Sequence, residues 1–356
     1  MTQTKTIRKS LRRAALSILK TSGVFAIVKN SEWRRQRLLI LCYHGVSLED
    51  EHRWWPALYV SPLLLERRFS ILKKGHYNVL SLCDALQRLY KKDLPPRSVA
   101  ITFDDGGYDF YHQAHPILGK FGYPATVYLT TYYSEKQLPI FNLVCPYLMW
   151  KAKNIGIVDL PEFGIAHPVN LGSDEARREA TAQMMLWADQ QNLTAVQKDE
   201  LAASLAGRLH IDYRRIVAKR ILQIMNQQEV RQLAAAGIDF QLHTHRHRTP
   251  LDEELFRREI RENRDWISAA AGNVGKHFCY PSGVYRPEFL PWLSAEQVVS
   301  ATTCDTNLAS VKDNPLLLPR LIDTSGRSDL EFESWVNGIG YFLSSRRPAH
   351  PAEPTD

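Results

Sequence analysis

The chain has 356 residues, 44% of them apolar, which is enough for one large α/β domain with an added subdomain or for two domains. Its five cysteines are scattered, odd in number and without Cys-x-x-Cys spacing, which argues against a disulfide framework or a zinc ribbon and favours reduced thiols in a cytosol. The net charge of +7 is concentrated at one end: residues 1–37 carry ten basic residues and one acidic residue, a surplus of nine, so the rest of the chain has a formal charge of −2 (7 minus 9). Because the body is nearly neutral, we expect no nucleic acid partner.

The surplus charge belongs to an N-terminal arm, residues 1–37. Its apolar stretch, residues 14–28, is interrupted by Lys20 and Ser22-Gly23, so it lacks the length of a spanning helix and the clean apolar core of a secretory signal. Apolar residues at helical spacing in the arm are Leu11, Ala15, Ile18 and Leu19. This pattern is typical of a helix that lies on an anionic membrane surface. A basic helix packed on the domain, or a disordered arm, explains the sequence equally well.

Without an export signal, we expect a cytoplasmic protein. If the arm is a membrane helix, the protein is peripheral at the inner face of the membrane.

Strands alternate with helices through the body, which predicts a parallel sheet. Expected strands are residues 38–42, 98–103, 125–130 and 238–242, and expected helices are residues 61–75, 81–90, 111–121, 227–236 and 255–271. From residue 134 to about 225 this rhythm stops, and residues 174–206 and 212–225 are rich in good helix formers. We therefore predict a mostly helical insertion at residues 134–225. The Pro-rich tail, residues 346–356, is expected to be disordered.

Two adjacent carboxylates, Asp104 and Asp105, follow the apolar strand at residues 98–103. Neighbouring side chains of a strand point to opposite sides, so one carboxylate can hold a metal ion while the other handles protons. Gly106 and Gly107 supply a tight turn that lets a ligand approach. Taken alone, the same residues also suit an ordinary solvated turn.

Three histidines alternate at His243, His245 and His247, after the strand expected at residues 238–242. Neutral imidazoles are common metal ligands. His243 and His247 converge on one ion if the segment turns, whereas all three share a face if it stays extended. With Asp105 they form a ligand set that leaves positions open for water and substrate, as catalytic metal sites do.

These motifs resemble those of a known family. Thr102-Phe-Asp-Asp-Gly106, followed by His243-Thr-x-x-His247, resembles the first two motifs of the polysaccharide deacetylases, also called NodB-homology or carbohydrate esterase family 4 enzymes. Tyr43-His-Gly-Val46 resembles the opening of the Tyr-His-x-Val branch, Phe278-Cys-Tyr-Pro-Ser-Gly283 the third motif, and Leu318-Pro-Arg320 a closing segment. The resemblance covers roughly residues 38–325.

The resemblance implies a distorted (β/α) barrel of the polysaccharide deacetylase type, built from residues 38–133 and 226–345 around the insertion. It implies a metal-dependent hydrolase that removes N-acetyl groups from amino sugars of a polysaccharide or a lipid-linked glycan precursor. The ligands would be Asp105, His243 and His247, and the divalent metal would be zinc, with cobalt or nickel as alternatives. His245 falls outside the family's ligand pair.

The resemblance also implies catalytic roles for individual residues. Asp104 would be the general base, and the backbone N–H of Ser282 would stabilise the oxyanion. Many members carry an arginine in the third motif that orients the aspartate, and this chain has Cys279 there instead. Many also carry a late Leu-x-His motif that supplies the acid, and this chain has none. We expect Arg320 to take the first role and His44, at the end of the first strand, to take the second.

Two other functions stay open: a catalytically silent glycan-binding protein with the same fold, and a hydrolase of a non-sugar amide. Asp104 argues against the first, because binding alone does not need a base.

Overall fold

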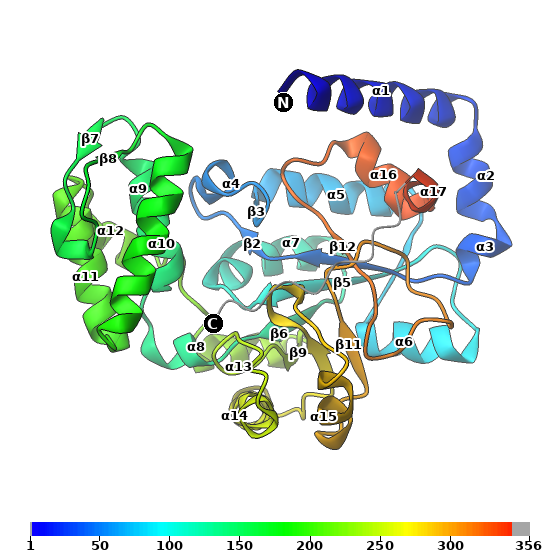
Figure 1. Ribbon diagram of the computed structural model, residues 1–356. Helices are drawn as coiled ribbons and strands as arrows, with labels where there is room; N and C mark the ends of the chain where they lie inside the picture. Colours follow the sequence, from blue (N-terminus) through cyan, green and yellow to red (C-terminus); the bar gives the residue numbers. More distant parts are fainter. Residues whose placement is uncertain (1, 344–356) are drawn as a thin grey trace.

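A closed parallel sheet forms the centre of the protein, whose computed structural model describes residues 2–343, with side chains from Ser10 onward (Figure 1). The eight strands are β1 (Leu39–Tyr43), β4 (Asn78–Leu80), β5 (Ser98–Asp105), β6 (Thr126–Leu129), β9 (Asp239–Leu242), β10 (His277–Cys279), β11 (Ser300–Thr302) and β12 (Leu321–Ile322). They run in the order β11-β10-β9-β6-β5-β1-β12, and β4 pairs with β5. A single bridge between Thr302 and Leu318 joins β11 to the segment before β12, so the sheet closes on itself. The predicted distorted (β/α) barrel is confirmed.

Helices cover the outside of this barrel (Figure 1). They are α5 (Pro62–Lys74), α6 (Leu82–Lys91), α7 (His115–Phe121), α13 (Gln227–Ala235), α14 (Glu253–Ala271), α15 (Phe289–Ala295), α16 (Asp329–Asn337) and α17 (Ile339–Leu343). Ser61 and Ser81 cap α5 and α6 at the expected positions, each by accepting a backbone N–H three residues on. The helix expected at residues 111–121 starts instead with a wider π turn, η1 (Phe110–Ala114). Pro116 explains this start, because it has no N–H for the regular i to i−4 hydrogen bond.

The segment between the two halves of the barrel forms a subdomain with its own apolar core, at the left in Figure 1. Its elements are α8 (Tyr132–Lys136), α9 (Phe141–Lys151), β7 (Ile157–Val158), η2 (Pro161–Phe163), β8 (Val169–Asn170), α10 (Asp174–Gln190), α11 (Ala195–Arg208) and α12 (Tyr213–Ala218). It is mainly helical but contains a small antiparallel hairpin, β7 with β8. The segment rich in helix formers, residues 174–206, contains two helices, because Thr194 starts α11 with a capping box.

The loop after β1 reaches toward this insertion. It contains β2 (Gly45–Val46), α4 (Glu51–Trp54) and β3 (Tyr59–Val60), and β2 pairs with β3 in parallel. Tyr59 belongs to the insertion's apolar core, and Trp54 and Leu58 pack against that core. The loop therefore connects the active end of β1 to the insertion.

The N-terminal residues form α1 (Thr2–Thr21), α2 (Val24–Asn30) and α3 (Glu32–Arg35). Leu16 and Phe25 are buried against Ile339 of α17, so the arm packs on the barrel. Arg34 is fully buried and donates hydrogen bonds to the carbonyl oxygens of Val336, Arg37 and Ser98. The charge pattern placed the end of the arm at residue 37. Residues before this position already pack against the barrel.

Among the described residues, no helix has both the length and the apolar character needed to cross a membrane. The tail expected to be disordered, residues 346–356, lies outside the described residues.

Candidate active site

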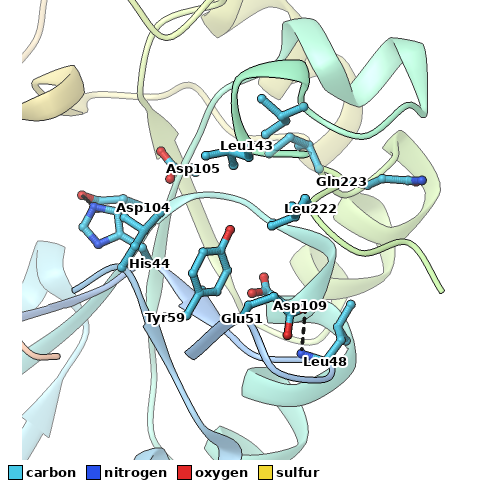
Figure 2. A pocket seen from close by; sticks show the side chains of 15 residues that line it. His44, Leu48, Glu51, Tyr59, Asp104, Asp105, Asp109, Leu143, Leu222 and Gln223 are labelled. Carbon is cyan, nitrogen blue, oxygen red and sulfur yellow. Dashed lines mark hydrogen bonds and ion pairs between the residues drawn. The ribbon is translucent and has the colours of Figure 1, made fainter. Parts of the chain in front are cut away.

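The carboxyl ends of the barrel strands bring the predicted site residues to one edge of the sheet. Asp104 and Asp105 end β5, and His44 directly follows β1. The other predicted site residues come from the segments next to β9, β10 and β12, and they are His243, His247, Ser282 and Arg320. Figure 2 shows His44, Asp104 and Asp105 grouped beside a pocket.

Asp105, His243 and His247 form a compact group of potential metal ligands. The Nε2 atoms of His243 and His247 lie 3.2 and 3.3 Å from Oδ1 of Asp105. Zinc bonds of about 2.0–2.1 Å at tetrahedral angles would separate ligand atoms by about 3.3 Å. Oδ1 of Asp105 is buried and has no hydrogen-bond donor within the described residues. An orphaned carboxylate oxygen facing two imidazole nitrogens fits a divalent cation.

His243 is oriented for this role by two hydrogen bonds. Its Nδ1 lies 2.8 Å from the carbonyl oxygen of Cys279, so Nδ1 carries the proton and donates it there. Nε2 is then left with a free lone pair toward Asp105. The backbone N–H of His243 donates to Oδ1 of Asn263 at 3.0 Å. Both contacts fix the tautomer and the orientation that a metal ligand needs.

The loop that carries His247 is fastened to α14 by Glu259. This carboxylate is fully buried and accepts from the backbone N–H of Arg246 at 2.7 Å and from Nε of Arg248 at 2.9 Å. His247 itself is exposed over 40% of its side chain. The position of this ligand therefore depends on Glu259 rather than on its own packing.

Several residues at the site have left-handed backbone conformations that side chains other than glycine rarely adopt. The φ angles are 69° at Asp105, 63° at Thr244, 55° at His247 and 55° at Ser282. Such conformations persist only where surrounding contacts stabilise them, and they turn the chain sharply at each strand end. Because the chain turns after β9, His243 and His247 converge on Asp105, which is the first of the two arrangements that the sequence allowed.

His245 points elsewhere. Its Nδ1 lies 2.8 Å from the hydroxyl of Thr131, and its Nε2 lies 3.9 Å from Glu262. It is absent from the groups of potential metal ligands among the described residues.

Asp104 is buried and held by Arg320. Two parallel hydrogen bonds, 2.7 and 2.9 Å long, run from the guanidinium to the two carboxylate oxygens. The thiols of Cys42 and Cys279 lie 3.5 and 3.4 Å from Oδ2. Burial alone would raise the pKa of Asp104, but the guanidinium of Arg320, with His44, holds it well below its usual range. The carboxylate is therefore ionised and fixed in orientation.

Arg320 contacts both carboxylate oxygens of Asp104, and its part in catalysis stays a prediction. It is fully buried, and its Nε donates to the carbonyl oxygen of Thr303 at 2.9 Å. Its Nη2 lies 3.2 Å from the sulfur of Cys279. The small thiol at position 279 leaves room for a guanidinium that arrives from the segment before β12.

His44 and Ser282 complete the group of predicted residues. Nε2 of His44 lies 3.6 Å from Oδ2 of Asp104, beyond direct hydrogen-bond distance. Burial lowers the pKa of His44, and the charge of Asp104 opposes this effect. Ser282 lies in the turn η3 (Pro281–Gly283) after β10, and its backbone N–H makes no hydrogen bond within the described residues.

A pocket opens beside the two aspartates (Figure 2). One wall comes from the insertion and its return segment, through Ile140, Leu143, Leu222, Gln223 and Ile224. The opposite side carries Glu51, Tyr59 and Asp109. Asp109 accepts a 2.7 Å hydrogen bond from the N–H of Val46, and burial, with the nearby charge of Glu51, raises its pKa to about 8. The insertion thus shapes the space next to Asp104 and Asp105.

Sequence reasoning missed Glu259, Asn263 and the acidic residues of the pocket. A signal for the first two exists in α14, where they occupy the same buried side as Phe256, Ile260 and Ile267. Polar residues at core positions of an amphipathic helix need a specific partner. Glu259 and Asn263 have this partner in the chain segment of residues 243–248.

The family model described as polysaccharide deacetylase matches residues 91–298, more than half of the chain. The chain belongs to the polysaccharide deacetylase family. This is a family of metal-dependent N-deacetylases, and the ligand group at Asp105 agrees with that dependence.

One curated relative in this family is the poly-beta-1,6-N-acetyl-D-glucosamine N-deacetylase of Escherichia coli (strain K12). It is 28% identical over 102 residues, which are 28% of this chain. The chain matches only 15% of the length of that protein.

Solved structures support the fold across most of the chain. The Streptococcus pyogenes deacetylase PplD, in complex with acetate, gives a TM-score of 0.54 at 19% identity and covers 81% of this chain and 93% of that one. IcaB from Ammonifex degensii gives a TM-score of 0.52 at 14% identity and covers 85% of this chain and 97% of that one.

Proposed function

We propose that this family member is a zinc-dependent hydrolase that removes N-acetyl groups from amino sugars of a polysaccharide or a lipid-linked glycan precursor. The proposal rests on Asp104 and Asp105, two adjacent carboxylates at the end of β5 that have different surroundings. Oδ1 of Asp105 faces two imidazole nitrogens and has no hydrogen-bond donor among the described residues, whereas Asp104 is held ionised by Arg320. Glycan binding alone explains neither environment.

One carboxylate and two imidazoles form a donor set that suits zinc, with cobalt and nickel as alternatives. When bound, the ion would polarise the acetyl carbonyl and lower the pKa of a water molecule. Asp105, His243 and His247 would hold it.

Asp104 would take the proton from the attacking water. Its carboxylate is ionised because Arg320 keeps its pKa low, and both oxygens have fixed directions because the guanidinium binds them in parallel. A positioned base of this kind contributes on the order of 10²- to 10⁴-fold in rate.

Two further groups would complete the reaction. The N–H of Ser282, which has no partner among the described hydrogen bonds, would donate to the oxyanion. As the C–N bond breaks, the proton collected by Asp104 would pass through His44 to the leaving amine, a step for which Nε2 of His44, 3.6 Å from Oδ2 of Asp104, must first close to hydrogen-bond distance. The products would be acetate and a free amino sugar.

The pocket supports an acyl substrate of small size. Its apolar side chains, Leu143 and Leu222, stand beside the aspartates and suit the methyl of an acetyl group. The insertion would therefore contribute to the choice of acyl group, a role that composition alone did not reveal.

The test is metal analysis of the purified protein combined with acetate release from N-acetylglucosamine oligomers and lipid-linked sugars. We expect a divalent metal and acetate release from at least one glycan class. Bound metal and glycan without any acetate release would favour the silent glycan-binding protein. Cleavage of simple amides but of no glycan would favour the non-sugar hydrolase.

A further inference from the structure

Tyr59 presents a hydroxyl without a partner to the pocket beside the two aspartates. The residue is only 7% exposed. Its hydroxyl makes no hydrogen bond within the part of the chain that the structure describes, although the hydroxyl of a buried tyrosine usually has a partner. Figure 2 shows this hydroxyl pointing into the pocket, toward the side where Asp105 and Leu222 lie. It is therefore available to a group that enters the pocket.

The other polar side chains deep in the pocket already have partners. Glu51 and Asp109 accept hydrogen bonds from backbone N–H groups of the loop after β1. The amide of Gln223 accepts from Arg220 and donates to a backbone carbonyl oxygen. The hydroxyl of Tyr59 is thus the group in the pocket that a ligand would satisfy.

The pairing of β2 with β3 holds Tyr59 in this orientation. Tyr59 lies opposite Gly45 in the register of the two strands. A Cβ at position 45 would lie 2.0 Å from Cε1 of Tyr59, so the ring can lie against β2 only because residue 45 is glycine. On the backbone side, the hydroxyl of Ser325 donates to the carbonyl oxygen of Tyr59 at 2.8 Å. The direction of the phenolic hydroxyl is therefore fixed, as selective recognition of a substrate group requires.

The pocket admits only a short group. Its cavity volume is about 30 Å³. One water molecule needs about 10–15 Å³ on this measure, so the pocket takes about two groups of that size. Leu143 and Leu222 line one side, and Tyr59 lies on the other. A methyl group would satisfy the leucines alone, whereas a methylene that carries a hydroxyl would satisfy both sides.

The charges of the pocket argue for a neutral acyl group. Four carboxylates line it, those of Glu51, Asp104, Asp105 and Asp109, and no lysine or arginine does so within the described residues. A carboxylate on the acyl group would be repelled. An ammonium would match the sign, but it would lose its water in this small cavity, where Glu51 and Asp109 are already bonded to backbone N–H groups. A hydroxyl needs no compensating charge.

We propose that the enzyme also hydrolyses N-hydroxyacetyl amino sugars, and that Tyr59 selects this acyl group by a hydrogen bond to its hydroxyl. The inference rests on the proposed function, because it concerns the acyl group of the same reaction. Water adds to the carbonyl carbon, the amide C–N bond breaks, and glycolate leaves in place of acetate. Tyr59 contacts the end of the acyl group rather than the bond that breaks, so it determines specificity.

The test compares acyl groups on the glycan class that releases acetate. Hydroxyacetyl and propionyl have nearly the same size, but propionyl has a methyl where hydroxyacetyl has the hydroxyl. We measure kcat/KM for both and take their ratio, which cancels any change in the chemistry common to both substrates. Tyr59→Phe keeps the ring and removes the hydroxyl. The ratio of hydroxyacetyl to propionyl should fall on the order of tenfold, because one hydrogen bond to the substrate is lost.

Tyr147→Phe is the matched control. Tyr147 belongs to the same apolar core of the insertion, its hydroxyl bonds to Asp50, and it is not part of the pocket lining. This variant should keep the wild-type ratio. A hydroxyl with a purely structural role would alter stability without changing the ratio, so the comparison separates packing from recognition.

Three results would overturn the proposal. One is the same ratio in the wild type and in Tyr59→Phe. Another is release of acetate without any release of glycolate. The third is faster release of glycine from an N-glycyl glycan than of glycolate, because the pocket would then recognise a cation. Release of neither acetate nor glycolate would contradict the proposed function itself, and this inference with it.

Discussion

The two halves of the site, which meet at the end of β5, are built differently. The base half, Asp104 with Arg320, is buried on every side and joined by two hydrogen bonds of ordinary length. The ligand half ends on a partly exposed histidine, His247, whose loop depends on one glutamate of α14. The chain alone therefore fixes the orientation of Asp104, whereas the position of His247 depends on a loop that a bound ion would help to hold.

The largest expected effect concerns the base half. Arg320→Ala would leave the Asp104 carboxylate buried without its partner, a change that typically costs about 3–5 kcal/mol. We expect a large loss in the free energy of unfolding, measured by urea denaturation, and Arg320→Lys should recover only part of it because lysine cannot bind both oxygens in parallel.

The pH dependence of this deficit follows from the pKa of Asp104. In the wild type the pKa of Asp104 lies below its unfolded value of about 3.9, so the pair stabilises the fold above that value and loses its contribution as the pH falls through the native pKa. Without the guanidinium, burial raises the pKa of Asp104, and stability then falls as the pH rises. The deficit of Arg320→Ala should therefore be smaller at pH 4 than at pH 7. A deficit that does not change with pH would contradict this account of the pair.

The next largest effect is expected on metal binding, in the ligand half of the site. Glu259→Gln weakens the hydrogen bonds that hold the loop of residues 244–248, so metal affinity should fall by roughly 10- to 100-fold. Competition with a metal chelator measures this directly. Glu254→Gln is the matched control, because Glu254 lies on the same helix, is largely exposed and, within the described residues, pairs with Arg261 alone. Equal metal affinity in both variants would remove Glu259 from the support of His247.

The smallest effect is expected at the middle histidine. His245→Ala removes a hydrogen bond to Thr131 but no contact with Asp105, so the metal content should stay near that of the wild type. His247→Ala, two residues on, should lose metal strongly. A His245→Ala protein that purifies without metal would contradict the ligand assignment.

Much of this architecture follows from local sequence signals. The strand at residues 98–105 and the capped helices after Ser61 and Ser81 depend on neighbouring residues, so they could be predicted. The four motif residues of the site, Asp104, Asp105, His243 and His247, were found through their spacing and family resemblance, and their roles stay predictions.

What the sequence did not reveal depends on distant contacts. Nothing near Arg34 in the chain indicates that its guanidinium is buried against Ser98 and Val336. Likewise, Glu259 acquires its role only because α14 packs beside the histidine loop, and the pocket exists only because the insertion folds back toward Tyr59. Long-range packing overrides what composition can indicate at such positions.

The central claim is that Asp104 acts as the base and Asp105 as a metal ligand. Measurements of metal content and acetate release on two variants test it most directly. Asp104→Asn should keep its metal and lose roughly 10²- to 10⁴-fold in turnover, because the proton acceptor is gone while Asp105, His243 and His247 are unchanged. Asp105→Asn should lose metal and activity together, because a charged ligand is gone. If Asp104→Asn loses its metal while Asp105→Asn keeps both metal and activity, the two roles are reversed and the account is wrong.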